Sequence, residues 1–341
     1  MPRPLKTWIR VAQSADALSG SITIRNANWR ADFLASPLQI AQATLHLGGG
    51  QLRWDPVVFT YGTVKGTASL DLPLDCPGPA PDLDPCLPQF QLQFGDLDAA
   101  HLQTAILGVH EQGSETGSLL SSLIDRLHPS SAPPWPRLQG TVRADSLILG
   151  PVTLRQPSAA VRVDPDGAKI TDLSAGLLGG QLQLSASVAK PATDQDKPGY
   201  ELEGSFQQVG PAALGQLIGL RWSGGPLNGS GKVDFAGYSA SDVAASAKGT
   251  LHFECQRGAI LPPSAAVAAH PAAFPPELAH FDHWTADSAI ASGAVTLGQN
   301  QLRQSGRSRS VQATLIFADP PKVTFRQAEE PQAAASKPQK P

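Results

Sequence analysis

The chain is short of charged and aromatic residues for its size. Only 16% of its 341 residues are Asp, Glu, Lys or Arg, against about 25% in an average soluble domain. The formal net charge of -3 supplies no basic field that would attract phosphates, so nucleic acid is not expected as a partner. Aromatic residues make up 6% of the chain, which, with its scattered acidic residues, disfavours a carbohydrate-active enzyme.

Long apolar runs are also absent. No uninterrupted stretch of about 18 apolar residues occurs, so the sequence predicts no transmembrane helix in this chain. Residues 1–11 have the positive charges of a signal peptide, but no apolar segment follows them. If the protein works outside the cytoplasm, we expect its export segment to be missing from this chain.

The sequence lacks the usual motifs of nucleophilic hydrolases and zinc proteases. The glycine-rich segment Asn228–Lys232 departs from a phosphate-binding loop at two positions, and we interpret it as a hairpin turn. The two histidines of His280–His283 would need a helix to share a face, and the flanking prolines favour a loop. We therefore expect a protein that is not an enzyme and that has no cofactor and no metal site.

There are three cysteines. Cys76 and Cys86 flank a loop rich in proline and aspartate, which a disulfide could close in an oxidising compartment. Two unrelated thiols are the alternative. Cys255 continues an apolar alternation and is expected to be buried.

Glycine and proline are plentiful, with 32 and 31 residues, and between them apolar and polar residues alternate with period two. In Gln89–Phe94, for example, three glutamines alternate with Phe90, Leu92 and Phe94. Such alternation predicts strands with one dry face and one wet face, and it recurs in roughly fifteen segments at hairpin spacing. The pattern predicts a mainly β protein made of antiparallel meanders.

The sequence also contains an internal repeat. At an offset of 130 residues, Ile22–Arg25 aligns with Val152–Arg155, and Gly49–Leu52 aligns with Gly179–Leu182. The offset then shortens to 112, where Phe94 aligns with Phe206. We expect residues 20–97 and 150–206 to form equivalent sets of strands, with the cysteine loop as an insertion in the first copy.

These observations predict five segments. They are an N-terminal segment (1–19), a first β repeat with the cysteine loop and a helical hairpin (20–134), a second β repeat with a short helix over residues 211–220 (135–224), a third, diverged β block (225–325) and a disordered tail (326–341).

The succession of Pro134–Gly140, Leu149–Leu154, Ala175–Leu182 and Leu227–Gly231 resembles the C-terminal region of the AsmA family, to which the TamB-like β-groove proteins of the bacterial envelope are related. The resemblance implies a periplasmic protein, anchored in the inner membrane by an N-terminal helix in full-length members. It also implies a role in moving or organising phospholipid between membranes.

The one-sided strands present more apolar surface than a few short helices can cover. Closed sandwiches or an open groove would both solve this, and the resemblance favours a groove. We expect tandem repeats of antiparallel, curved sheet that form an elongated groove, with short helices packed on it or capping it. The residues expected to line it are Leu70, Leu72, Phe90, Leu92, Phe94, Leu182, Leu184, Leu251 and Phe253.

The expected function is that of a cell-envelope lipid-handling protein, which binds or conducts phospholipid or another acyl-chain lipid along the groove. Its expected partners are this lipid, a bacterial membrane and other envelope proteins. The alternative is a non-enzymatic β scaffold for outer-membrane protein assembly.

Overall fold

The computed structural model describes residues 19–30, 37–74, 86–98, 137–149, 152–189, 197–237, 242, 245–262, 274–316 and 321–327. These residues form 18 strands with short helical segments, which confirms the predicted mainly β class. The expected helical hairpin of the first repeat and most of the expected N-terminal segment and tail lie outside the described residues. The chain divides into two compact units, which are taken in turn below.

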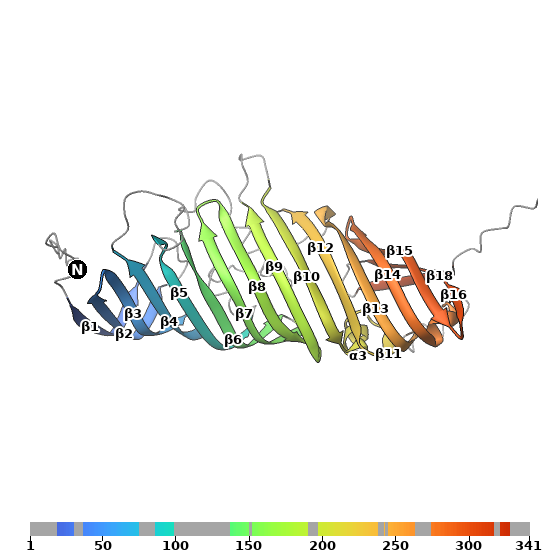
Figure 1. Cartoon of the computed structure of the whole chain (residues 1–341), viewed down its shortest axis with the longest axis horizontal. Helices are drawn as coiled ribbons and strands as arrows, with labels where there is room; N and C mark the ends of the chain where they lie inside the picture. The colour runs from blue at the N-terminus through green and yellow to red at the C-terminus, as the bar shows by residue number, and fades with distance from the viewer. Residues whose placement is uncertain are drawn as a thin grey trace, which may run out of the picture. The chain divides into compact units, whose positions relative to one another are not determined.

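Unit 1 comprises Met1–Gly176, Leu184–Tyr200 and Gly237–Ala240. Its strands lie side by side in chain order (Figure 1). They are β1 (Gly20–Trp29), β2 (Leu38–Gly48), β3 (Gln51–Tyr61), β4 (Val64–Pro73), β5 (Gln89–Asp98), β6 (Leu138–Leu149), β7 (Val152–Asp164) and most of β8 (Gly167–Leu177). From β1 to β7 each neighbouring pair is antiparallel except β5 and β6, which are parallel, so the expected antiparallel sheet is corrected at this point.

The next two strands, β9 (Gly180–Ala189) and β10 (Gly199–Val209), contribute residues to both units. Unit 2 otherwise holds the helix α3 (Pro211–Leu217), the 3-10 helix η4 (Pro276–Ala279) and the strands that follow β10. These are β11 (Arg221–Gly224), β12 (Leu227–Ala236), β13 (Lys248–Leu261), β14 (Phe281–Ala291), β15 (Ala294–Gln304), β16 (Arg307–Arg309), β17 (Val311–Ile316) and β18 (Lys322–Gln327). The expected short helix after β10 is confirmed, and Pro211 occupies its first turn.

Two short-range predictions are wrong. Asn228–Lys232 lies inside β12 and is not a turn, because its glycines leave room for rings and side chains from neighbouring strands. A β-carbon on Gly229 would lie 2.4 Å from the ring of Phe206. The expected loop at His280–His283 is also corrected, since β14 begins at Phe281.

The duplicated sequence corresponds to β1, β2, β3 and β5 in the first copy and to β7, β8, β9 and β10 in the second. The inserted segment contains a whole strand, β4, in addition to the cysteine loop. The two segments therefore do not form the same set of strands, and a simple superposition of them is wrong. Backbone conformation does repeat at the offset of 130. Asn26 and Gln156 both have positive φ, of 52° and 48°, and so do Gly49 and Gly179, of 60° and 87°.

Asn26 and Gln156 belong to a structural pattern that recurs along the chain. Five strands contain two consecutive exposed polar residues, of which the second is in the left-handed region. The pairs are Arg25–Asn26, Arg155–Gln156, Thr171–Asp172, Gln207–Gln208 and Gln256–Arg257. After each pair the alternation resumes one residue later, so the apolar side chains return to the same face of the sheet.

Glycines opposite aromatic rings shape the apolar face of unit 1. Gly140 of β6 is paired with Phe90 of β5, and a β-carbon at Gly140 would lie 1.9 Å from the Phe90 carbonyl oxygen. Gly66 of β4 lies between Phe94 and Phe59 in the same way. The rings therefore cover positions at which no other residue would fit.

We predict that Gly140→Ala destabilises the protein by about 1–3 kcal/mol, because the new methyl group overlaps backbone atoms that are fixed by strand pairing. Gly20→Ala is the matched control in β1, since nothing lies within 4 Å of its β-carbon position. The midpoint of urea unfolding measures both effects. Equal midpoints for the two variants would contradict the close approach of β5 and β6.

Candidate functional site

The apolar face of unit 1 is built from rows of directly paired residues that cross the strands. One row runs from β1 to β7 through Ile24, Ala43, Val57, Ala68, Leu92, Val142 and Ala159. The next row runs through Ile22, Leu45, Trp54, Leu70, Phe90, Gly140 and Val161. No residue of these two rows is charged or carries a hydroxyl or amide side chain.

The second row is not covered as a protein core would be. Leu45, Trp54, Leu70 and Phe90 are half-buried, and Ile22 is 58% exposed. Residues of a packed core are almost wholly removed from water. This row, with the half-buried Leu92 beside it, is therefore an apolar wall with an accessible surface, and we call the two rows the unit-1 wall.

The five expected lining residues of the first copy belong to one surface. Leu70, Phe90 and Leu92 lie in the wall. On the same face of the sheet, Leu72 is paired with Leu52 at one edge of the wall, and Phe94 lies at the opposite edge. Phe94 packs edge-on against Phe59, with ring centroids 6.0 Å apart. Phe59 belongs to a small buried cluster with Tyr61, Val64, Leu97 and Ala144, which closes one side of the wall.

Leu182 and Leu184 of β9 are also half-buried and alternate with the exposed glutamines Gln181 and Gln183. Sequence reasoning therefore placed these two leucines on the apolar face of their strand. It did not identify Trp54, Val57 or Val142, because their segments interrupt the alternation or lack a long enough run of it.

Leu251 and Phe253 have different surroundings in unit 2. Phe253 packs against Trp222 and Trp284, with ring centroids 6.2 Å and 4.9 Å away. The paired row next to it, Leu227, Cys255, Trp284 and Leu302, is at most 3% exposed. Phe253 therefore packs against a closed core, and Leu251, two residues earlier in β13, is half-buried.

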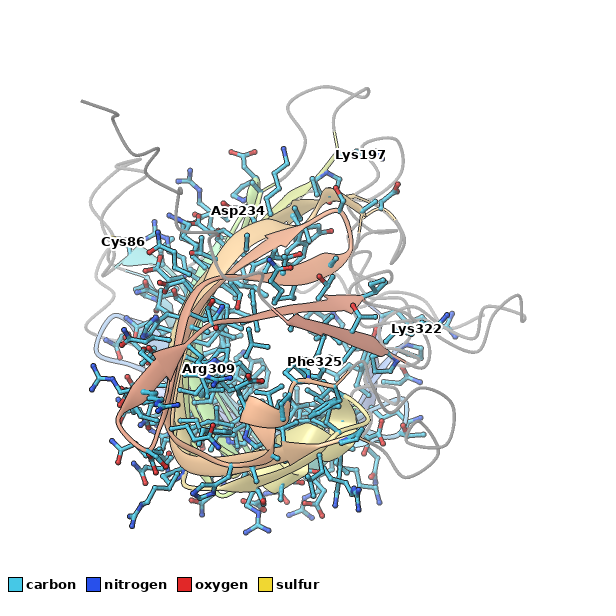
Figure 2. The ribbon with its side chains drawn as sticks, turned by 90° about the vertical axis from the view of Figure 1, so that its right-hand side faces the viewer. Cys86, Lys197, Asp234, Arg309, Lys322 and Phe325 are labelled. Carbon is cyan, nitrogen blue, oxygen red and sulfur yellow. The ribbon has the colours of Figure 1, made fainter. Side chains whose placement is uncertain are left out.

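The core of unit 2 is closed by its own short elements. Leu278 of η4 is fully buried in it, and Phe325 of β18 packs against Phe274 with ring centroids 5.0 Å apart. Figure 2 shows Phe325 inside the curve of the orange strands. The carboxylate of Glu277, 5% exposed, accepts a hydrogen bond from Arg309 and holds η4 to the hairpin of β15 and β16.

The polar faces carry hydrogen bonds between histidines and carboxylates. His283 Nε2 lies 2.8 Å from Glu254 Oε1, and this hydrogen bond is the main reason that the pKa of Glu254 is lowered. His252 Nδ1 lies 2.7 Å from Asp287 Oδ1. Over the described ranges, no group of three or more metal-ligating side chains is arranged to hold an ion.

The cysteines fall into two classes. Cys255 is a free thiol with no exposed surface, as expected from the sequence, and burial raises its pKa to about 11. Cys86 is disulfide-bonded. Its expected partner, Cys76, lies outside the described residues, so that pairing stays a prediction.

No protein-family model, curated protein or solved structure gives a significant match to the chain. Among the residues that the structure describes, no helix combines the length and apolar character needed to cross a bilayer.

We predict that Cys255 does not react with a thiol reagent at pH 8 in the folded protein, because the reactive thiolate is both rare and inaccessible. In denaturant without reductant, one thiol per chain should react, as counted by absorbance with Ellman's reagent. Three reactive thiols would contradict the pairing of Cys76 with Cys86, and rapid labelling of the folded protein would contradict the closed core.

A second prediction compares the wall with that core. Leu227→Ala should cost about 2–5 kcal/mol, because the side chain is 1% exposed and its removal leaves a cavity. Leu92→Ala should cost clearly less, since a half-buried side chain loses fewer contacts. Chemical unfolding followed by circular dichroism measures both changes. Equal losses would mean that Leu92 is part of a closed core.

Proposed function

We propose that this chain is a cell-envelope protein that binds acyl-chain lipid, phospholipid above all, along the unit-1 wall, and that it acts by binding rather than by catalysis. The observation that carries the proposal is the continuous row from Ile22 to Val161, which is apolar at every position and not buried at any of them. An exposed apolar surface of this continuity is costly in water unless a ligand or partner covers it.

The dimensions of the wall suit an acyl chain. Seven strands are separated by six spacings of about 4.8 Å, so the row is about 29 Å long. The hydrocarbon core of a bilayer, which is two acyl tails thick, measures about 30 Å. One tail would therefore cover about half of the row, and its CH₂ groups need dry contact and no hydrogen bonds.

The alternative of a second protein on the wall is less well supported. A protein partner brings backbone amides and carbonyls that need hydrogen-bonding groups, and the side chains of the two rows offer none. The disulfide at Cys86 supports the proposed periplasmic location, because disulfides persist in oxidising compartments. The sequence resemblance to the AsmA family supports both the location and the lipid.

The test is organic extraction and native mass spectrometry of the purified protein, with a pair of variants that differ by one position in β5. Leu92→Glu places a carboxylate on the wall and should reduce bound phospholipid at least tenfold, because burying an unpaired charge against acyl chains is costly. Gln93→Glu adds the same charge on the opposite, exposed face and should leave lipid binding unchanged.

Wild-type protein that carries no lipid, and that takes up none from phosphatidylglycerol vesicles, would overturn the proposal. The remaining candidate would then be a β scaffold for outer-membrane protein assembly. Equal lipid loss in the two variants would show that charge, and not the wall, determines binding.

A further inference from the structure

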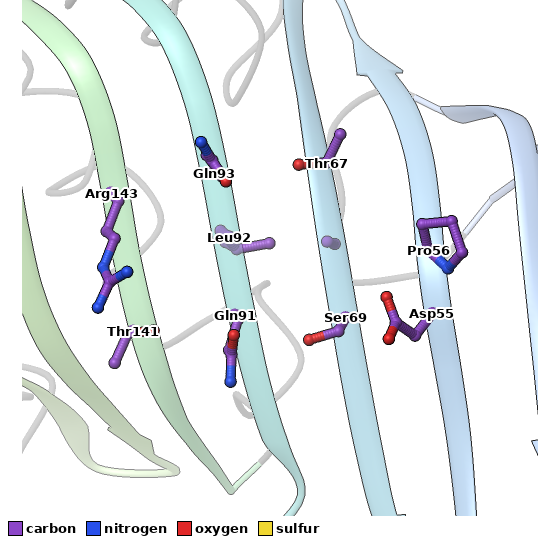
Figure 3. A pocket seen from close by; sticks show the side chains of 10 residues that line it. Asp55, Pro56, Thr67, Ser69, Gln91, Leu92, Gln93, Thr141 and Arg143 are labelled. Atoms are coloured by element: carbon purple, nitrogen blue, oxygen red, sulfur yellow. The ribbon is translucent and has the colours of Figure 1, made fainter.

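The polar face of unit 1 contains a depression of its own, shown in Figure 3. It has a volume of about 190 Å³ and lies over β3, β4, β5 and β6. It adjoins the irregularity in β3, where the register with β4 shifts between Trp54 and Val57. Two residues of the wall, Ala68 and Leu92, also line it. Since Gln91 and Gln93 alternate with Leu92, the polar side chains of the site lie on the face opposite the wall, and the inference does not rest on the proposed lipid function.

Hydrogen-bonding side chains cross the depression in two paired rungs. One rung consists of Ser69, Gln91 and Thr141, and the other of Thr67, Gln93 and Arg143. Adjacent members of a rung belong to strands about 4.8 Å apart. The rungs therefore form a grid of hydroxyl and amide groups on a rigid sheet.

The charges at the two ends of the grid differ. At the β6 end, Arg143 has no carboxylate within ion-pair distance in the described part of the chain, and Asp145, further along β6, does not line the depression. At the β3 end, the Asp55 carboxylate accepts a hydrogen bond from Arg53 at 2.8 Å. A free guanidinium at one end thus faces an already neutralised carboxylate at the other.

We propose that this depression binds a hydroxyl-rich ligand with a single carboxylate or phosphate, such as an acidic sugar. The anionic group pairs with the guanidinium of Arg143, whose planar donors match two oxygens of either anion. The hydroxyl groups lie over the two rungs, where glutamine amides both donate and accept hydrogen bonds. The Asp55 carboxylate at the other end offers no donor to a second anion, so the ligand takes one orientation.

The test is a titration of the full-length protein followed by calorimetry, with glucuronate, glucose 6-phosphate, glucose and acetate as probes. Glucuronate or glucose 6-phosphate should bind saturably, and whichever binds more tightly identifies the anion as carboxylate or phosphate. Glucose and acetate should bind at least tenfold more weakly, because each lacks one half of the recognised chemistry.

Three variants locate the site. Arg143→Gln should weaken binding of the acidic sugar about tenfold, and Gln93→Ala should weaken it while leaving the preference over glucose intact. Arg155→Gln removes the same charge from the neighbouring strand β7, outside the depression, and should have no effect. Circular dichroism confirms that each variant is folded.

The proposal is overturned if neither acidic sugar binds at millimolar concentration, if acetate binds as well as glucuronate, or if Arg155→Gln weakens binding as much as Arg143→Gln. None of these results bears on the lipid wall, because Leu92→Glu and its phospholipid measurement test the opposite face.

Discussion

The structure depends on keeping most of the apolar side chains on one face of strands that bend. A strand of period two that bends at an extra residue would send the rest of its apolar side chains to the wet face. In β1, β7, β8, β10 and β13 this is avoided by a pair of exposed polar residues, the second in the left-handed region. A left-handed non-glycine residue costs roughly 1–2 kcal/mol, which is comparable to the cost of exposing a single large apolar side chain and far less than that of exposing the rest of a strand.

This constraint leads to different results in the two units. In unit 2, short elements such as η4 and the segment at Phe325 cover the apolar face, and the row through Leu227, Cys255, Trp284 and Leu302 is removed from water. In unit 1 the buried cluster around Phe59 covers only one side of the face. The rows beside it keep an accessible apolar surface, which is the physical basis for the proposed lipid binding.

The two faces of the same strands therefore offer separate chemistry. Along β5, Phe90 and Leu92 form part of the wall, while Gln91 and Gln93 form part of the grid that ends at Arg143. Because the sheet fixes both sets of side chains through the same backbone, a ligand on either face meets a preorganised surface. The glycine at position 140, opposite Phe90, allows two strands to approach closely enough to keep that surface continuous.

The sequence by itself determined the class of the fold, the strand segments around Phe90 and Leu182, the helix that begins at Pro211, and the burial of Cys255. Each follows from local information, namely period-two alternation, proline at a helix start and apolar neighbours two residues apart. Consecutive polar pairs such as Arg25–Asn26 and Gln207–Gln208 were also readable as breaks in the alternation, although a left-handed bend was not inferred from them.

Only the tertiary structure decided which residues face one another across strands. The parallel pairing of β5 with β6 depends on a connection of many residues, which periodicity does not constrain. The same holds for Asn228–Lys232. Its glycines predict a turn, but in the structure the ring of Phe206 packs against Gly229 within a strand. Leu92 and Phe253 have the same local pattern, yet one lies on an accessible wall and the other against a closed core, because burial is decided by elements distant in the chain.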